Sequence, residues 1–143
     1  EVWFEVTTLL IPGYNDSGSE LEKLSCWMVE QLGPEVPLHF SAFHPDWKMT
    51  DVERTPHQTL IRAREIALAN GIHHVYLGNV HDHQGSSTYC HACGQILIGR
   101  DWYVLSDWNL DSQGRCSNCL EPCPGHFEPT PGSWGSRRQP VQV

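Results

Sequence analysis

The chain has 143 residues, enough for one domain of ordinary size with a small addition. Its net charge of −8, with only nine basic residues, argues against binding to nucleic acid or to an anionic membrane surface, because phosphate recognition needs clustered Lys and Arg. No apolar stretch has the length of a transmembrane helix and no signal peptide is visible, so we expect a cytoplasmic protein that does not enter the membrane.

The first predicted strand covers residues 2–11, a continuous apolar and β-branched run of the kind that is buried on both faces of a sheet. A helix follows. Ser17 and Glu20 form the S-x-x-E pattern of a helix start, and Gly33-Pro34 ends the apolar periodicity. Alternating apolar residues predict a second strand over residues 37–44.

The second predicted helix begins at the sequence Thr55-Pro56-His57-Gln58, with Thr55 as the cap and Pro56 as the first helical residue. Asn70-Gly71 ends this helix, and residues 73–80 form a third strand. Strands and helices that alternate in this way predict a parallel sheet with right-handed crossovers over residues 1–83. Three strands are too few for a closed barrel, so we expect this chain to lack an N-terminal part of the protein.

Residues 84–127 have a different texture and are expected to form a small separate domain. Cys90-x-x-Cys93 and Cys116-x-x-Cys119 each predict a tight turn that presents two thiolates, and a short hairpin is predicted between them. Four thiolates brought together in this way form the tetrahedral zinc site of a zinc ribbon. Residues 128–143, rich in Pro and Gly, are predicted to be a disordered tail.

Two alternatives to zinc follow from the same cysteines. The sequence from Cys116 to Cys123 and Pro124 matches the end of a ferredoxin-type run, so an iron–sulfur cluster is possible if the first pair completes it. Free or disulfide-bonded cysteines are the other alternative. We favour zinc because it uses the two symmetrical pairs and leaves Cys123 outside the site. His91, inside the first pair, is a substitute ligand or a solvent-facing residue.

Polar residues follow the ends of the predicted parallel strands, where α/β folds bind their ligands. His44 and Asp46 follow the second strand and Asn79 ends the third, so they form a candidate site. Equally, His44 is a capped strand end and Asp46 a turn former. Thr7 is either a packed strand residue or a ligand contact. His81 and His83 have the spacing of a metal chelate but no third ligand nearby.

Three stretches together resemble the C-terminal half of a radical S-adenosylmethionine enzyme, namely VTTLLIPGYNDSGSELEKL, FSAFHPDWKMTDVERTPHQTLIRAREIALANGIHHVYLGNV and TYCHACGQILI. The resemblance is to the AmmeMemoRadiSam system radical SAM proteins, related to pyruvate formate-lyase-activating enzymes. It implies the last three strands of a partial (β/α) barrel, followed by a zinc ribbon. In the intact family a [4Fe–4S] cluster binds S-adenosylmethionine and cleaves it to a 5′-deoxyadenosyl radical, which abstracts hydrogen from the substrate.

The resemblance also implies a set of cofactor-binding residues. His44 matches a histidine that contacts the nucleoside of S-adenosylmethionine, Pro12 and Gly13 match the loop at the mouth of the pocket, and Thr7 stands where the activating enzymes carry an arginine. Asn79 is added to these residues because of its position at the end of the third strand, and not from the resemblance. The three-cysteine loop that holds the cluster has no counterpart in this sequence, because Cys116, Cys119 and Cys123 have the reverse spacing.

We therefore expect a C-terminal fragment of a radical S-adenosylmethionine enzyme that is inactive alone. Its partner would be the missing N-terminal half of the barrel or a complementing chain, and its substrate is a protein or a small molecule. The alternative is a non-catalytic zinc-ribbon module on an α/β scaffold that binds a protein partner.

Overall fold

The computed structural model describes residues 2–133 and 135–137. The chain separates into two compact units, Glu1–Ser86 and Ser87–Val143, and each is described by itself. The predicted boundary after residue 83 differs from this division by one short helix, which belongs to the first unit.

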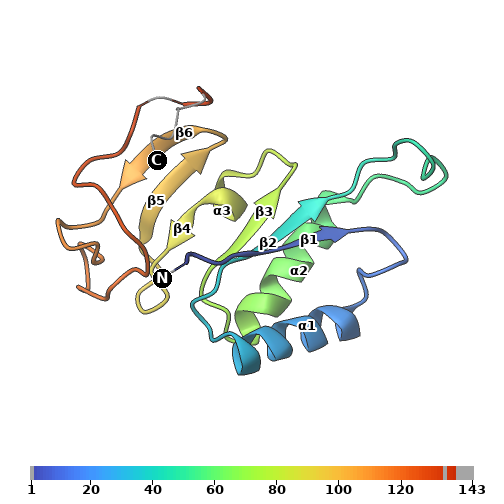
Figure 1. Cartoon of the computed structure of the whole chain (residues 1–143), viewed down its shortest axis with the longest axis horizontal. Helices are drawn as coiled ribbons and strands as arrows, with labels where there is room; N and C mark the ends of the chain where they lie inside the picture. The colour runs from blue at the N-terminus through green and yellow to red at the C-terminus, as the bar shows by residue number, and fades with distance from the viewer. Residues whose placement is uncertain (1, 134, 138–143) are drawn as a thin grey trace. The chain divides into compact units, whose positions relative to one another are not determined.

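The first unit is a three-stranded parallel sheet with its crossover helices (Figure 1). The strands lie in chain order, β1-β2-β3, and Val6 pairs with Leu38, which in turn pairs with Val75. The elements are β1 (Val6–Leu10), α1 (Gly18–Gln31), β2 (Leu38–Ala42), α2 (His57–Ala69), β3 (Val75–Gly78) and the short α3 (His83–Ser86). The predicted strand–helix alternation and the parallel sheet are confirmed.

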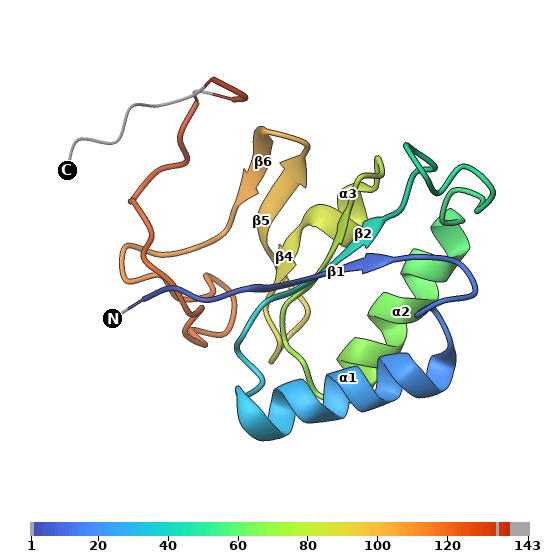
Figure 2. The same cartoon turned by 45° about the vertical axis from the view of Figure 1, so that its right-hand side comes forward.

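Both long helices cover the same face of the sheet, as Figures 1 and 2 show. Alternate strand residues meet apolar residues of α1 and α2 in one core, because side chains along a strand point to opposite faces. The fully buried members are Leu10, Leu38, Phe40, Ala42, Val75 and Leu77 from the sheet, and Leu21, Met28, Leu60, Ala63 and Ala67 from the helices. The opposite face carries more polar side chains, with Thr7 on β1, His39 and Ser41 on β2, and Tyr76 on β3.

The predicted start and end of α1 are confirmed. The Oγ of Ser17 accepts a hydrogen bond from the backbone N–H of Glu20 at 3.4 Å and donates to the Glu20 carboxylate at 2.8 Å. At the other end Gly33 has a φ of 92°, and its N–H donates to the Met28 carbonyl at 3.1 Å. Gly33 thus supplies the left-handed residue that stops a helix.

The predicted cap of α2 is wrong. The helix begins at His57 with Pro56 at the cap position, and no side chain caps it. Thr55 is buried instead: its hydroxyl donates to the Leu10 carbonyl at 2.6 Å and accepts from the Phe43 N–H at 2.8 Å. The hydroxyl therefore ties the ends of β1 and β2 together and provides hydrogen-bond partners for backbone groups at both ends.

The first strand is shorter and less buried than predicted. It begins at Val6, and residues 2–5 precede it as exposed, irregular chain. Leu9 is 44% exposed, so β1 is not buried on both faces. The reason is its place in the sheet: β1 is an edge strand, and helices cover only one face of that sheet. Apolar composition alone does not distinguish such a strand from one enclosed on both sides.

The second unit is a small antiparallel sheet with strand order β4-β5-β6. Its strands are β4 (Thr88–Tyr89), β5 (Ile96–Asp101) and β6 (Val104–Trp108), and β5 and β6 form the hairpin predicted between the cysteine pairs. Its buried core holds three aliphatic side chains, Leu97, Ile98 and Leu110, together with Cys90, Cys116 and Cys123.

The predicted disordered tail falls partly outside the described residues, since 134 and 138–143 are not among them. Residues 128–133 and 135–137 contain no helix or strand. Within the described part of the chain, no helix combines the length and the apolar character needed to cross a membrane.

Candidate metal centre and strand-end pocket

The first cysteine pair forms a tight turn that brings its two sulfur atoms to the same side. The Gly94 N–H donates to the Cys90 carbonyl at 2.9 Å, and the Cys90 N–H donates to the Gln95 carbonyl at 2.8 Å. Gly94 has a φ of 75°, which favours glycine because a Cβ is crowded in this conformation. The sequence Cys-x-x-Cys-Gly therefore encodes this turn locally.

The second pair repeats the same turn with a different residue at its critical position. The Leu120 N–H donates to the Cys116 carbonyl at 2.9 Å, and the Cys116 N–H donates to the Glu121 carbonyl at 2.8 Å. Leu120 stands where the first turn has Gly94, and its φ is 65°. A non-glycine residue in the left-handed region costs about 1–2 kcal/mol. The hydrogen bond from the Leu120 N–H to the Cys116 carbonyl closes the turn around Leu120. The same turn places Cys116 and Cys119 on one side.

The two turns bring four sulfur atoms together. The Sγ atoms of Cys90 and Cys119 lie 3.5 Å apart and those of Cys93 and Cys116 lie 3.7 Å apart, and all four are within 4.8 Å of one another. A tetrahedral ion with metal–sulfur bonds of about 2.3 Å requires sulfur–sulfur separations of about 3.8 Å. A disulfide requires about 2.05 Å, and all six cysteines are free thiols. The group thus has the dimensions of a four-cysteine metal site.

Cys123 and His91 lie outside this group of four ligands. Cys123 is buried in the small core of the second unit, and its N–H donates to the Gly114 carbonyl at 2.9 Å. The imidazole of His91 lies 3.6 Å from the carboxylate of Glu121. An iron–sulfur cluster built on the complete run from Cys116 to Cys123 would take Cys123 as a ligand, and Cys123 is not among the four clustered sulfur atoms. The zinc reading needs only the four clustered cysteines.

The thiols of the cluster differ in their pKa values. Hydrogen bonds from Asn118 and from the backbone N–H of Gln95 lower the pKa of Cys93 to about 6. Burial raises the pKa of Cys90. The Glu121 backbone N–H lowers the pKa of Cys119, but the neighbouring Cys93 sulfur and burial outweigh it and raise the value to about 12. A cation that binds this cluster must displace protons from its thiols. Its positive charge then compensates the repulsion between the thiolates that form.

The residues predicted to bind S-adenosylmethionine lie in different surroundings. His44 is exposed after the end of β2. Pro12 and Gly13 lie in the turn after β1, where the Gly13 N–H donates to the Asp16 carboxylate at 2.8 Å. Thr7 is exposed within β1, on the face that α1 and α2 do not cover. Thus His44, Pro12 and Gly13 gather at the carboxyl edge of the sheet, and Thr7 lies further back.

Asn79 and Asp46 have structural roles at the same edge. Asn79 has a φ of 59°, and its amide Nδ2 donates to the Ala42 carbonyl at 3.1 Å, which joins the ends of β2 and β3. The carboxylate of Asp46 accepts a hydrogen bond from the Trp47 N–H at 2.7 Å, and a backbone bridge links Asp46 to Met49. Asp46 is therefore a turn former, one of the two alternatives that the sequence left open.

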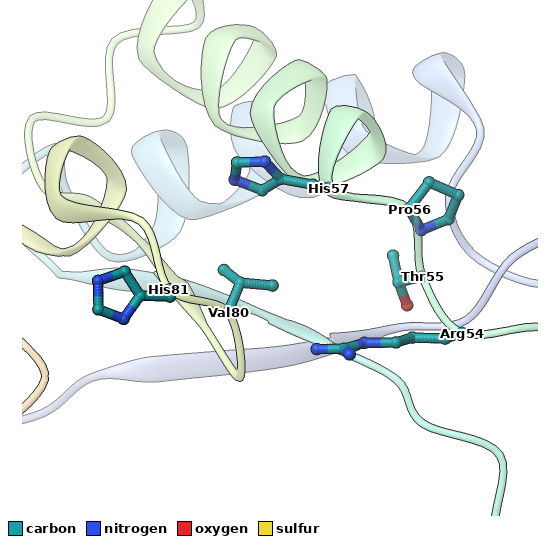
Figure 3. A pocket seen from close by; sticks show the side chains of 6 residues that line it. All are labelled: Arg54, Thr55, Pro56, His57, Val80 and His81. Carbon is teal, nitrogen blue, oxygen red and sulfur yellow. The ribbon is translucent and has the colours of Figure 1, made fainter.

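A pocket of about 450 Å³ opens at this carboxyl edge, beside the start of α2 (Figure 3). It is lined by Arg54, Thr55, Pro56, His57, Val80 and His81. The guanidinium of Arg54 donates to the Asn79 carbonyl at 3.1 Å, and the imidazole of His57 lies 2.7 Å from the Asp82 carboxylate. Asp82 in turn accepts a hydrogen bond from the Gly85 N–H at 2.8 Å.

Sequence reasoning missed Arg54, His57 and Asp82. No sequence motif marks these three residues. The available signal was their position: Arg54 and His57 lie at the start of α2, and Asp82 follows β3, so all three are near the carboxyl edge of the sheet. His81, considered as half of a metal chelate, lines this pocket, whereas His83 begins α3. Among the described residues, neither of the two belongs to a group of side chains that could hold a metal.

Comparison with known proteins gives one informative match. A protein of Methanocaldococcus jannaschii, described as uncharacterized protein MJ0808, is 46% identical over 121 residues. The match covers 84% of this chain but only 36% of the relative, so the chain spans little more than a third of the relative's length. No protein-family model matches the chain, and no solved structure matches it.

Proposed function

We propose that this chain is the C-terminal part of a radical S-adenosylmethionine enzyme of the activating-enzyme type, followed by a structural zinc ribbon. The observation that carries the proposal is the winding of the parallel sheet. Its strands follow chain order, and both crossover helices cover one face. A (β/α) barrel is wound in this way, with its helices around the outside. One half of a doubly wound sheet is wound in the same way, but the complete doubly wound sheet reverses its strand order and has helices on both faces.

The face of the sheet opposite α1 and α2 supports this proposal. Apart from the exposed Leu9, it carries polar or half-buried strand residues, and the His39 imidazole lies 2.8 Å from the Glu5 carboxylate and stacks on the Tyr76 ring at 5.0 Å. In a barrel this face lines the interior. These side chains pair with one another and are only partly buried. They therefore suit a barrel interior that holds a ligand better than a barrel interior that is filled with aliphatic side chains.

The edge of β1 and the size of the relative support a longer protein. In the first unit β1 pairs only with β2, and Leu9 together with Trp3 and Phe4 before the strand is strongly exposed. A further parallel strand against β1 would satisfy its backbone groups and cover this apolar surface. The archaeal relative has ample chain for such strands, since the match leaves nearly two thirds of it unpaired. The partner we propose is therefore the N-terminal half of the barrel.

We propose one zinc ion for the four-cysteine group. Four protein ligands close a tetrahedral site and leave no position for substrate, so the ion stabilises the fold. The cluster of a radical enzyme needs a different arrangement, three cysteines that leave one iron open. The described residues do not fit it, because the pairs Cys90/Cys93 and Cys116/Cys119 face one another as a closed set. Radical generation would therefore depend on residues outside this sequence. Thiolate ligands also require reduced cysteines, in keeping with the expected cytoplasmic location.

Within the intact enzyme, the carboxyl edge would provide part of the S-adenosylmethionine pocket. His44 is exposed beyond β2, so its ring is accessible to the nucleoside. Pro12 and Gly13 would border the entrance, Asn79 would keep the ends of β2 and β3 together, and Thr7 would face the barrel interior. The cofactor would supply the radical chemistry, and these residues would bind and orient it.

The test is production of 5′-deoxyadenosine. The full-length archaeal relative, purified and reconstituted without oxygen, should form 5′-deoxyadenosine from S-adenosylmethionine and dithionite, and our chain treated identically should form none. If the relative also has a histidine at the position of His44, its replacement by alanine should weaken S-adenosylmethionine binding up to about tenfold, the loss of one neutral hydrogen bond. A full-length relative without an iron–sulfur cluster would contradict the proposal, as would product formation by our chain alone.

A second candidate function is a zinc-ribbon module that binds a protein. The observation in its favour is the tip of the β5–β6 hairpin, where Trp102, Tyr103 and Val104 are each about 60% exposed. Exposed aromatic residues are typical anchors of protein interfaces. If this function holds, Tyr103→Ser should abolish capture of a partner by the zinc-loaded chain while leaving its zinc content unchanged, and the archaeal relative should show no cofactor cleavage.

A further inference from the structure

We propose that the strand-end pocket binds an anionic group, a phosphate or a carboxylate, of a small-molecule ligand, with Arg54 as its main contact. Three of the six residues that line the pocket have nitrogen-bearing side chains, and they come from two segments: Arg54 and His57 lie at the start of α2, and His81 follows β3. Figure 3 shows the Arg54 guanidinium along one wall, His57 across the pocket and His81 on a third side.

The guanidinium of Arg54 is held in place without being neutralised. It donates one hydrogen bond, to the Asn79 carbonyl at 3.1 Å, and within the described part of the chain no carboxylate forms an ion pair with it. A guanidinium carries five N–H donors in a planar fork. The remaining donors match the paired oxygens of a phosphate or carboxylate, which arginine binds through two parallel hydrogen bonds.

The other walls of the pocket are also fixed by hydrogen bonds. The His57 ring is oriented by Asp82, whose side chain is only 14% exposed. Thr55 is anchored to the ends of β1 and β2 through its hydroxyl. A ligand would therefore meet groups that are already in position, which reduces the entropy that binding must overcome.

The start of α2 adds to the attraction for an anion. The helix has 13 residues, no acidic residue in its first turn and no side chain that caps it. Its N-terminal backbone N–H groups carry a partial positive charge, and Pro56 and His57 place this end at the pocket. The helix end strengthens a site that Arg54 defines.

The net charge of the chain opposes anion binding, whereas the size of the pocket suits a small-molecule ligand. The whole chain has a net charge of −8, so its long-range field repels anions. Screening over about 8 Å at physiological salt limits that repulsion, and the local groups then decide whether an anion binds. The volume of about 450 Å³ exceeds that of one anionic group and leaves room for the organic part of a ligand, within the usual range of small-molecule sites.

The experiment titrates the whole zinc-loaded chain with inorganic phosphate and, separately, with succinate, while amide NMR shifts are recorded. Buffers contain neither anion, and ionic strength is held at about 0.15 M. Saturable shifts at residues 54, 55, 57 and 80–82 are expected with at least one probe, and the probe that binds identifies the anionic group. Iron, S-adenosylmethionine and reductant are absent, so the result is independent of the proposed radical chemistry.

Two arginine variants decide the question. Arg54→Gln should weaken the anion at least tenfold, since it removes a charge-assisted pair of hydrogen bonds. Arg62→Gln is the matched control: Arg62 is also exposed and also donates to one backbone carbonyl, that of Asp16, but it lies outside the pocket. It should change affinity less than twofold. Absence of saturable shifts with both probes, or equal losses in the two variants, would overturn the proposal.

Discussion

Replacing Cys93 by Ser should unfold the second unit and leave the first unit intact. Cys93 is suited to this test because its side chain is exposed, so the substitution removes a metal ligand with little direct loss of packing. The wild-type chain should bind one zinc ion, and the variant should bind none at stoichiometric concentrations.

The expected size of the effect follows from the core of the second unit. Its three buried aliphatic side chains, Leu97, Ile98 and Leu110, contribute at most about 5–9 kcal/mol when removed from water. Zinc binding contributes about 10–16 kcal/mol in zinc-finger peptides at neutral pH. The metal term is the larger of the two, so the unit should not remain folded without it. The core around α1 and α2 is separate and should be unaffected.

The assay combines metal analysis by mass spectrometry with amide NMR spectra. In Cys93→Ser the resonances of residues 88–120 should collapse to random-coil positions while those of β1, β2 and β3 persist. Cys123→Ser is the matched control, because Cys123 belongs to the same unit but not to the cluster. This control should keep its zinc and lose only about 1–3 kcal/mol for a polar atom in a buried position.

Three results would refute the reasoning. The first is a Cys93→Ser chain that keeps one zinc and a folded second unit. The second is loss of metal in Cys123→Ser. The third is a brown protein, purified without oxygen, with an absorbance band near 400 nm and about four irons per chain, which would identify an iron–sulfur cluster in place of zinc.

The remaining predictions concern the turns, the strand ends and the open edge. Leu120→Gly should raise the stability of the zinc-loaded second unit by up to about 1 kcal/mol and Gly94→Leu should lower it by about 1–2 kcal/mol, because both positions have positive φ; thermal melts showing equal effects would contradict this. Thr55→Val should destabilise the first unit by about 2–3 kcal/mol in urea, since two buried backbone groups lose their partner, and an unchanged midpoint would argue against the bridge. Zinc loading at pH 7.5 should release at least two protons per ion, as two cluster thiols have raised pKa values, so affinity should increase with pH; calorimetry in buffers of different ionisation enthalpy measures this. Our chain should associate at high concentration through the β1 edge, and Leu9→Lys should reduce the association seen by light scattering; a wild-type monomer would refute it.

The sequence by itself determined the features that depend on neighbouring residues. The Ser17 cap, the Gly33 stop and the first cysteine turn are set by backbone conformations and hydrogen bonds that span only a few residues. The alternation of strands and helices likewise follows from local periodicity, and short crossovers then require a parallel sheet. The cluster of four cysteines was predictable because two equivalent local turns were recognisable on either side of a hairpin.

Only the tertiary structure decided what depends on contacts between distant segments. Thr55 satisfies strand ends far away in sequence instead of capping its own helix, and Leu9 is exposed because β1 lies at the edge of a sheet covered on one face. Arg54 and His57 line one pocket, and Asp82 contacts His57, because β2 and β3 are parallel neighbours and so end at the same edge. Local sequence preferences carry no information on such long-range pairing, since it is fixed only when the strands assemble and the helices pack against them.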